Sequence, residues 1–120
     1  MTTLHPFPHH KLDAYHRALD LVCLADRLAA AIPRGHRSLA DQLLRAATSV
    51  ALNLSEGANR LTSGEKRACF SIDRGECGEA AAAAEIAAAL RLVPASDAEQ
   101  LVAMAGRVGA MLTGLIQRHR

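Results

Sequence analysis

Apolar side chains recur at helical spacing along most of the chain. In the first such segment they are Leu12, Tyr15, Leu19, Val22 and Ala29. These positions are separated by three, four or seven residues, which is the spacing of the apolar stripe on an amphipathic helix. Pro33 and Gly35 follow and interrupt the pattern. We therefore predict a first helix over residues 11–32.

Two more segments carry a comparable stripe. Over residues 37–59 the core side consists of Leu39, Leu43, Ala46, Val50 and Leu54. Near the C-terminus it consists of Leu101, Met104, Ala105, Val108, Leu112 and Leu115. Both stripes predict helices that bury one face.

Two sequences of the form S/T-x-x-E mark further helix starts. Thr62 and Glu65 fit a capping box that opens a third helix, which continues through an Ala-rich run to about Leu92 and ends before Pro94. Ser96 and Glu99 fit a second capping box that opens the fourth helix.

These four helices define the expected fold. Period-two alternation is absent from the sequence, so no strand is predicted. Connections of a few residues make consecutive helices antiparallel neighbours. We predict an all-α protein, with an antiparallel up-down-up-down four-helix bundle over residues 11–120 and an extended N-terminal arm over residues 1–10.

Composition adds an expectation of self-association. The chain has 120 residues, of which half are apolar, but 25 are alanine and only Phe7, Tyr15 and Phe70 are aromatic. Small side chains bury little area each, so the core of a single chain is thin and association between chains is favoured. Leu44 and Leu52 lie on the side of the second helix away from its core stripe, which predicts a second packing surface, between subunits.

Charge and cysteine content place few constraints on function. The formal net charge is +2, with basic residues in excess over residues 34–74 and after residue 106. Cys23, Cys69 and Cys77 form no CxxC pair and are odd in number, as expected for reduced thiols. With no signal sequence or membrane-spanning apolar run in view, we expect a cytoplasmic protein.

The N-terminal arm is rich in histidine but does not predict a metal site. His5, His9, His10 and His16 have no Cys or carboxylate partner at a recognised ligand spacing. We expect no metal and no cofactor.

A polar stripe runs along the predicted second helix. At about 100° per residue, six polar side chains share an arc of about 80° beside the core stripe. They are Gln42, Arg45, Ser49, Asn53, Glu56 and Arg60. The position of the stripe predicts contact with another helix or another subunit.

The predicted third helix supplies partners for that stripe. Its apolar face is expected to contain Ala68, Ile72, Gly75, Ile86 and Leu90, with Glu79 among them. Antiparallel pairing about the turn at residues 60–64 sets Arg45 opposite Glu79 and Ser49 opposite Gly75. We predict a partly buried Arg45–Glu79 ion pair, with Gly75 allowing a close helix crossing.

The same polar residues do not form a recognisable catalytic constellation. Glu56, Asp73 and Glu76 supply carboxylates, but no catalytic triad, Cys-His pair or Gly-rich phosphate loop accompanies them. Ion pairing and capping at the corner between the second and third helices is the preferred interpretation, and we expect no enzyme.

The stretch "DQLLRAATSVALNLSEGANR" resembles the Q-L-x-R-A-x-x-S-I-x-x-N-I-x-E-G-x-x-R motif of the proteins encoded in intervening sequences of bacterial 23S ribosomal RNA genes. The residues that match the signature are Gln42, Arg45, Ala46, Ser49, Asn53, Glu56, Gly57 and Arg60, and on the next helix Phe70, Arg74, Gly75 and Glu79. Asp73 and Glu76 depart from the family pattern and add negative charge beside Arg74.

The resemblance implies an antiparallel four-helix bundle whose biochemical role is unsettled. Members are similar to the accessory variability determinant of diversity-generating retroelements, a pentameric barrel that binds nucleic acid and partners a reverse transcriptase. This relation implies a homopentamer.

The leading hypothesis is a non-enzymatic homo-oligomer that binds RNA or other nucleic acid through phosphate contacts. The candidate cations are Arg34, Arg37, Arg60, Lys66, Arg67, Arg107, Arg118 and Arg120. The alternative is a protein-interaction scaffold or an accessory subunit for a reverse transcriptase, docking through the far side of the second helix or the Ala-rich face of the third.

Overall fold

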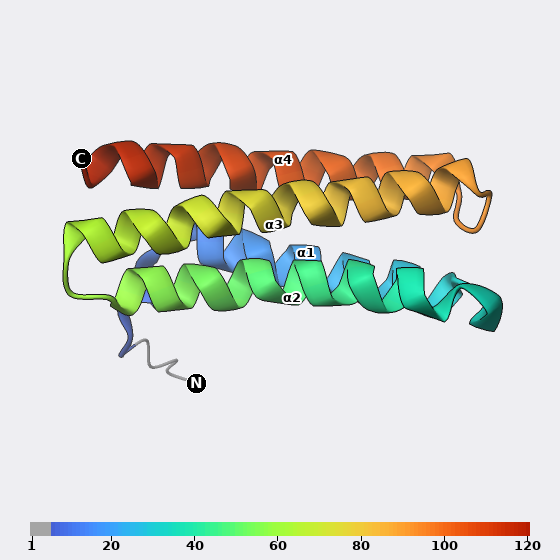
Figure 1. Ribbon diagram of the computed structural model, residues 1–120, viewed down its shortest axis with the longest axis horizontal. Coiled ribbons are helices and arrows are strands. Elements are labelled where there is room, and N and C mark those ends of the chain that lie inside the picture. Colours follow the sequence, from blue (N-terminus) through green and yellow to red (C-terminus); the bar gives the residue numbers. More distant parts are fainter. Residues whose placement is uncertain (1–5) are drawn as a thin grey trace, which may run out of the picture.

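The computed structural model describes residues 6–120, and these residues contain helices and no strand. Four long helices follow one another: α1 (Asp13–Ala31), α2 (Arg37–Asn59), α3 (Ser63–Ala89) and α4 (Ala95–Arg118). Two short 3-10 helices, η1 (Pro8–Lys11) and η2 (Arg34–His36), precede α1 and α2. The all-α, four-helix expectation is confirmed (Figure 1).

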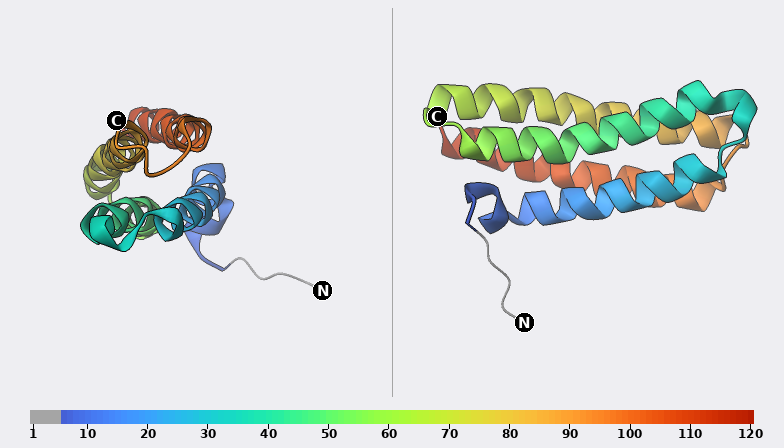
Figure 2. Two further views of the ribbon diagram at one scale, coloured as in Figure 1. Left: turned by 90° about the vertical axis from the view of Figure 1, so that its right-hand side faces the viewer. Right: turned by 90° about the horizontal axis from the view of Figure 1, so that it is seen from below.

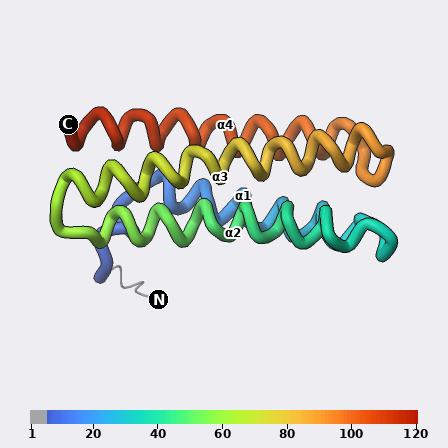
Figure 3. Tube along the Cα trace, in the orientation of Figure 1, coloured from blue at the N-terminus to red at the C-terminus, as the bar shows by residue number. Residues whose placement is uncertain are grey.

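The helices form an antiparallel bundle in which each packs against its neighbours. The principal contacts join α1 to α2, α2 to α3, α3 to α4, and α4 back to α1, which gives the up-down-up-down arrangement visible end-on and from below (Figure 2). The α2–α3 connection, η1 and the chain's C-terminus lie at one end, which we call the C-terminal end of the bundle (Figure 3). The α1–α2 and α3–α4 connections lie at the opposite end.

The core faces of α2 and α4 are those that the sequence predicts. Leu43, Val50 and Leu54 are fully buried on α2, and Leu101 and Leu112 are fully buried on α4. On α1 the core face is rotated from the expected stripe, since it consists of Ala14, Ala18, Leu21, Leu24, Ala25 and Leu28. Leu19, expected inside, is 41% exposed. Alanines can take the core positions because they let the helices approach closely.

The predicted core face of α3 is wrong. Ile72, Ile86 and Leu90 are 62%, 50% and 52% exposed, and Ala68 and Gly75 are also on the surface. The buried face instead consists of Phe70, Asp73, Cys77, Ala80, Ala83, Ala84 and Ala87. Alanine occurs all around this helix, so apolar periodicity alone did not select the correct side.

Of the two predicted capping boxes, the first forms only in part: Thr62 caps α3, but Glu65 accepts from the Thr62 hydroxyl and not from its backbone N–H. The Thr62 hydroxyl accepts from the Glu65 backbone N–H at 3.2 Å and donates to the Glu65 carboxylate at 2.8 Å. The box at Ser96 does not form, because α4 already begins at Ala95 with Pro94 as its N-cap residue. The third helix ends at Ala89, before the expected residue, and Arg91 takes a left-handed conformation with φ of 59°.

The N-terminal segment differs from the extended arm expected over residues 1–10. Its first five residues lie outside the described residues, but Pro8–Lys11 form η1, which packs against α2. Proline favours a helix start because its φ is already near the helical value. Among residues 6–120, no helix is both long enough and apolar enough to cross a membrane.

Candidate nucleic-acid interface

Two arginines of the polar stripe on α2 form ion pairs with α3. Arg45 donates to Glu79, and its second terminal nitrogen lies 4.0 Å from Glu76 Oε2. The predicted Arg45–Glu79 pair is therefore present, but it is more exposed than expected, with side chains 55% and 41% exposed. The other stripe residues range from exposed Gln42 to half-buried Ser49 and Asn53, while Arg74 on α3 is exposed.

Arg60 closes the stripe at the α2–α3 corner. Its guanidinium donates to Glu56 at 2.5 Å, one turn earlier, and lies 3.7 Å from Glu65 at the start of α3. The bond from Arg60 to Glu56 and the charge of that carboxylate raise the pKa of Arg60 above its usual value. Both acids reduce the net positive charge that this arginine presents to a ligand.

Of the two signature glycines, Gly57 lies at a close contact between helices and Gly75 does not. A Cβ atom on Gly57 would lie 2.7 Å from Phe70 Cε1, so only glycine fits beneath that ring. At Gly75 a Cβ atom would meet nothing within 4 Å. The expected close crossing at Ser49 and Gly75 is therefore wrong. The tight contact between α2 and α3 is the one between Gly57 and Phe70, near the corner that joins the two helices.

Two predicted phosphate-binding cations already bind backbone carbonyls. Lys66 Nζ donates to the carbonyl of Ala58 at 2.8 Å and contacts that of Gly57 at 3.4 Å. Arg67 donates to the carbonyl of His119. Carbonyls at a helix C-terminus have no partner within the helix, so Lys66 and Arg67 neutralise the ends of α2 and α4.

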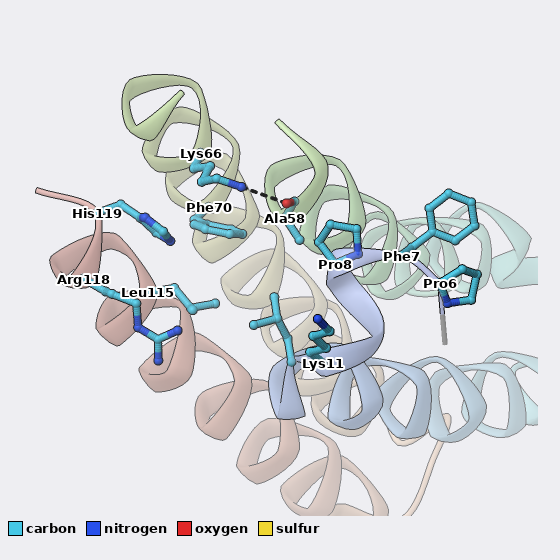
Figure 4. A pocket seen from close by; sticks show the side chains of 11 residues that line it. Pro6, Phe7, Pro8, Lys11, Ala58, Lys66, Phe70, Leu115, Arg118 and His119 are labelled. Atoms are coloured by element: carbon cyan, nitrogen blue, oxygen red, sulfur yellow. Dashed lines mark hydrogen bonds between the residues drawn. The ribbon is translucent and has the colours of Figure 1, made fainter. Parts of the chain in front are cut away.

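A pocket of about 370 Å³ opens at the C-terminal end of the bundle. Its lining comes from Pro6 and Phe7, from η1 and Leu12, and from the adjoining ends of α2, α3 and α4 (Figure 4). Lys11, Lys66 and Arg118 contribute positive charge, while Phe70 and Leu115 contribute apolar surface. Sequence analysis missed Lys11 and His119 here, because the pocket joins segments far apart in the chain.

The imidazole of His119 responds to the positive charge around it. Burial lowers its pKa, and Lys66, Arg118 and Arg67 lower it further, in that order. The side chain is consequently neutral at pH 7, and the ring lies 6.2 Å from that of Phe70 between centroids. The C-terminal end of the bundle therefore has a positive local field.

The remaining candidate cations do not join this group as a single patch. Arg120 follows His119 at the C-terminal end, so this end holds five of the eight candidates. Arg34 and Arg37 lie at the opposite end, in η2 and at the first residue of α2. Arg107 is exposed midway along α4.

Asp73 is the one fully buried charged side chain among residues 6–120. Neither of its carboxyl oxygens has a hydrogen-bond partner within the described part of the chain. Burial, and secondarily the charge of Glu76, raises the pKa of Asp73 to about 8. This carboxyl points into the core and not toward Arg74, so it does not reduce the positive surface as sequence analysis expected of it.

The histidines near the N-terminus pack with aromatic residues. The Asn59 amide donates to His9 Nδ1 at 2.9 Å, and the His9 ring meets Tyr15 edge-on at 4.6 Å. His16 Nε2 lies 2.8 Å from the carbonyl of His10, while His5 falls outside the described residues. Within the described chain no group of three His, Cys, Asp or Glu side chains is arranged to hold a metal ion.

These features define an all-α four-helix bundle with an ion-paired polar stripe along α2 and a cationic end. Residues 10–114 match the model of the 23S rRNA-intervening sequence protein family. The chain belongs to that family, as its signature on α2 indicated.

Comparison with solved structures supports the same fold. A crystal structure of a protein of unknown function from the S23 ribosomal protein family of Bacteroides thetaiotaomicron superposes with a TM-score of 0.81. The two sequences are 15% identical, and the match covers 86% of this chain and 97% of the other. No curated protein matches this chain.

Proposed function

We propose that this protein is a non-enzymatic homo-oligomer that binds RNA, or another nucleic acid, through phosphate contacts at the C-terminal end of the bundle. The observation that carries the proposal is the gathering of cations there. Lys11, Lys66 and Arg118 line one pocket, Arg67 contacts His119 beside it, and Arg120 follows in the chain. Lys and Arg side chains bind phosphates whatever the base sequence, so such a cluster favours nucleic acid over a neutral partner.

The family name is the reason to test RNA first, although it describes where the proteins are encoded and not what they bind. The family's description refers to an intervening sequence of 23S rRNA, and the structural relative from Bacteroides is assigned to a ribosomal protein family. Only three aromatic residues occur in the chain, so reading of single-stranded bases by stacking is not part of the proposal.

Association of several copies would compensate for the modest charge of each chain. Leu52, Ile72, Ile86 and Leu90 are all at least half exposed on α2 and α3. Exposed apolar surface of this kind is typical of a protein interface. We favour a ring of five subunits. Each copy would present its cationic end to the same nucleic acid, so the phosphate contacts of the copies would reinforce one another through multivalency. Three free cysteines agree with a cytoplasmic location.

The test is RNA and DNA binding measured by fluorescence anisotropy over a range of salt concentrations. We expect binding of structured RNA that weakens steeply with salt, with log K falling in proportion to the number of phosphates contacted. Arg118→Gln/Arg120→Gln should weaken binding and make the salt slope shallower by about 0.7–0.9 per lost contact. Arg34→Gln/Arg37→Gln removes the same charge at the opposite end and should change binding much less.

Two outcomes would overturn this proposal. One is the absence of salt-sensitive binding to either structured RNA or duplex DNA. The other is a larger loss in the Arg34→Gln/Arg37→Gln variant than in Arg118→Gln/Arg120→Gln, which would place the contact at the wrong end of the bundle. Light scattering with mass determination tests the oligomeric state separately.

The alternative function is a protein-interaction scaffold, for example an accessory subunit of a reverse transcriptase. The observation that favours it is the exposed position of Leu52 on the far side of α2. Within the Ala-rich run of α3, Ala80, Ala84 and Ala87 are buried in the core, so docking on this helix would use its exposed alanines, Ala82 and Ala89. A protein partner that is retained after nuclease treatment, and lost in Leu52→Asp, would favour the scaffold.

A further inference from the structure

The pocket at the C-terminal end of the bundle combines two chemistries. Lys11 and Arg118 lie at its mouth, while Phe70 and Leu115 lie deeper (Figure 4). Phe70 is 1% exposed and Leu115 6% exposed, so these two side chains form a covered base. The apolar lining that a ligand can reach comes mainly from the exposed Pro6, Phe7 and Pro8. No Asp or Glu side chain of the described residues lines this pocket.

Its positive charge is available to a ligand. Among residues 6–120, neither Lys11 nor Arg118 has a carboxylate within 4.0 Å of its charged nitrogens. Lys66 is held by the carbonyls of α2 but still adds its charge at close range. Burial lowers the pKa of the neighbouring His119, and the charges of Lys66 and Arg118 lower it further, so this imidazole adds no competing positive charge.

The pocket is larger than a phosphate-only site requires. A volume of about 370 Å³ is enough for a small organic ligand. Other surface depressions of the bundle measure about 320–390 Å³, so the lining of this pocket, and not its size, distinguishes it. Contacts with phosphates of a nucleic-acid backbone are made at open surfaces and need no apolar lining. The combination fits an anion that carries a compact apolar group.

We propose that this pocket binds a phosphomonoester attached to a compact apolar or aromatic body. The dianionic head group would lie at the mouth with Lys11 and Arg118, since a phosphate carries about −1.5 to −2 charges at pH 7 and Arg binds it well. The body would lie against the exposed apolar lining of Pro6, Phe7 and Pro8, above Leu115, and the imidazole of His119 can donate one hydrogen bond. A backbone phosphodiester is a different ligand, so this proposal stands apart from RNA binding.

The test is titration of phenyl phosphate into the isotope-labelled full-length protein, followed by NMR. We expect saturable shifts of backbone amides at the pocket, with a Kd on the order of 0.1–1 mM for so small a ligand. Lys11→Gln and Arg118→Gln should each weaken binding about fivefold or more. Arg27→Gln, which removes an exposed charge from α1, is the matched control and should leave the Kd within about twofold.

Two reference ligands separate the head group from the body. Inorganic phosphate offers the charge alone, and benzyl alcohol offers the ring alone. Each should bind at least about tenfold more weakly than phenyl phosphate. Equal binding of inorganic phosphate would overturn the proposal, because the apolar lining would then contribute nothing. So would the absence of saturable shifts, or equal binding by the two pocket variants and the wild type.

The same head group occurs on small molecules and on the 5′ end of a nucleic-acid strand. A short RNA with a 5′-phosphate and its 5′-hydroxyl counterpart distinguish these sources. A preference of about fivefold or more for the 5′-phosphate, lost in Lys11→Gln, supports the strand end. No preference, together with phenyl phosphate binding, supports a small molecule. If neither RNA binds but phenyl phosphate does, RNA binding fails and the pocket proposal holds.

Discussion

Gly57 of α2 lies directly against the ring of Phe70 on α3, so close that a methyl group at residue 57 would overlap the ring. The ideal Cβ position is 2.7 Å from Cε1 and 2.9 Å from Cδ1 of Phe70. Phe70 is 1% exposed and forms part of the covered base of the pocket. The contact therefore joins the family signature on α2 to the core and to the pocket.

We expect Gly57→Ala to destabilise the bundle. Overpacking of a core typically costs about 1–3 kcal/mol, and the better helix propensity of alanine returns at most about 1 kcal/mol. The net loss should be about 1–2 kcal/mol in the free energy of unfolding, measured by urea denaturation. Gly57→Ala/Phe70→Leu should recover part of it, since the smaller side chain makes room.

Gly75→Ala is the matched control. It places the same methyl group in the interior of a helix, where nothing lies within 4 Å. The variant should be as stable as the wild type or more stable by about 0.5–1 kcal/mol. A comparable loss of stability in both variants would mean that the Gly57–Phe70 contact is not the reason for glycine at residue 57.

The Arg45–Glu79 pair should contribute little to stability. Sequence reasoning expected a partly buried pair, but the side chains are 55% and 41% exposed. Exposed ion pairs contribute about 0.2–1 kcal/mol. A double-mutant cycle with Arg45→Met and Glu79→Gln should give a coupling free energy in this range, decreasing in 1 M salt. Coupling above about 2 kcal/mol, or coupling insensitive to salt, would contradict this account.

The fold could be predicted from the sequence because three apolar stripes, two helix-start signals and short connections leave few alternatives. Which side of α3 is buried could not be predicted from its largest aliphatic residues, because Ile72 and Ile86 are exposed. The correct face has the spacing 3, 4, 3, 4, 3, as the positions Phe70, Asp73, Cys77, Ala80, Ala84 and Ala87 show. Asp73 within this series concealed it, because a carboxylate is not expected in a core.

The candidate interface was predictable in its residue types but not in its geometry. Lys66 and Arg67 are basic in the sequence, yet only the fold shows that both bind carbonyls at helix ends. Lys11 meets Arg118 at one pocket because η1 folds back onto the bundle. Contacts between chain segments this distant depend on packing and leave no local pattern.

Cys77 should be the least reactive of the three thiols. It is buried on α3, and burial, with smaller effects of Asp73 and Glu76, raises its pKa to about 12. The thiolate is the reactive form, so modification requires opening of the bundle. Two variants each keep one thiol: Cys23→Ser/Cys69→Ser keeps Cys77, and Cys69→Ser/Cys77→Ala keeps the exposed Cys23. With a disulfide reagent at pH 7.5, Cys77 should react about a thousandfold or more slowly than Cys23. Similar rates in both variants would show that Cys77 is accessible.

Asp73 should make the stability of the bundle depend on pH. Its folded-state pKa of about 8 lies above the ordinary value of 3.8, chiefly because burial disfavours the charged form. Between these values the folded state holds a proton that the unfolded state has lost. The contribution of Asp73 to the free energy of unfolding is therefore greatest below about pH 4. It falls by up to about 1.4 kcal/mol per pH unit as the pH rises toward 8, and above that pH it is constant.

Asp73→Ala isolates this effect, because other carboxylates titrate alike in both proteins. The variant should be more stable than the wild type by about 2 kcal/mol or more at pH 8, and the difference should shrink toward pH 4.5, as measured by urea denaturation across that range. At low pH the protonated aspartic acid is neutral, so removing it relieves no charge and only the smaller side-chain volume matters. A difference that grows as pH falls would mean that Asp73 is ionised and stabilised in the folded protein, and would require a cationic partner in the core.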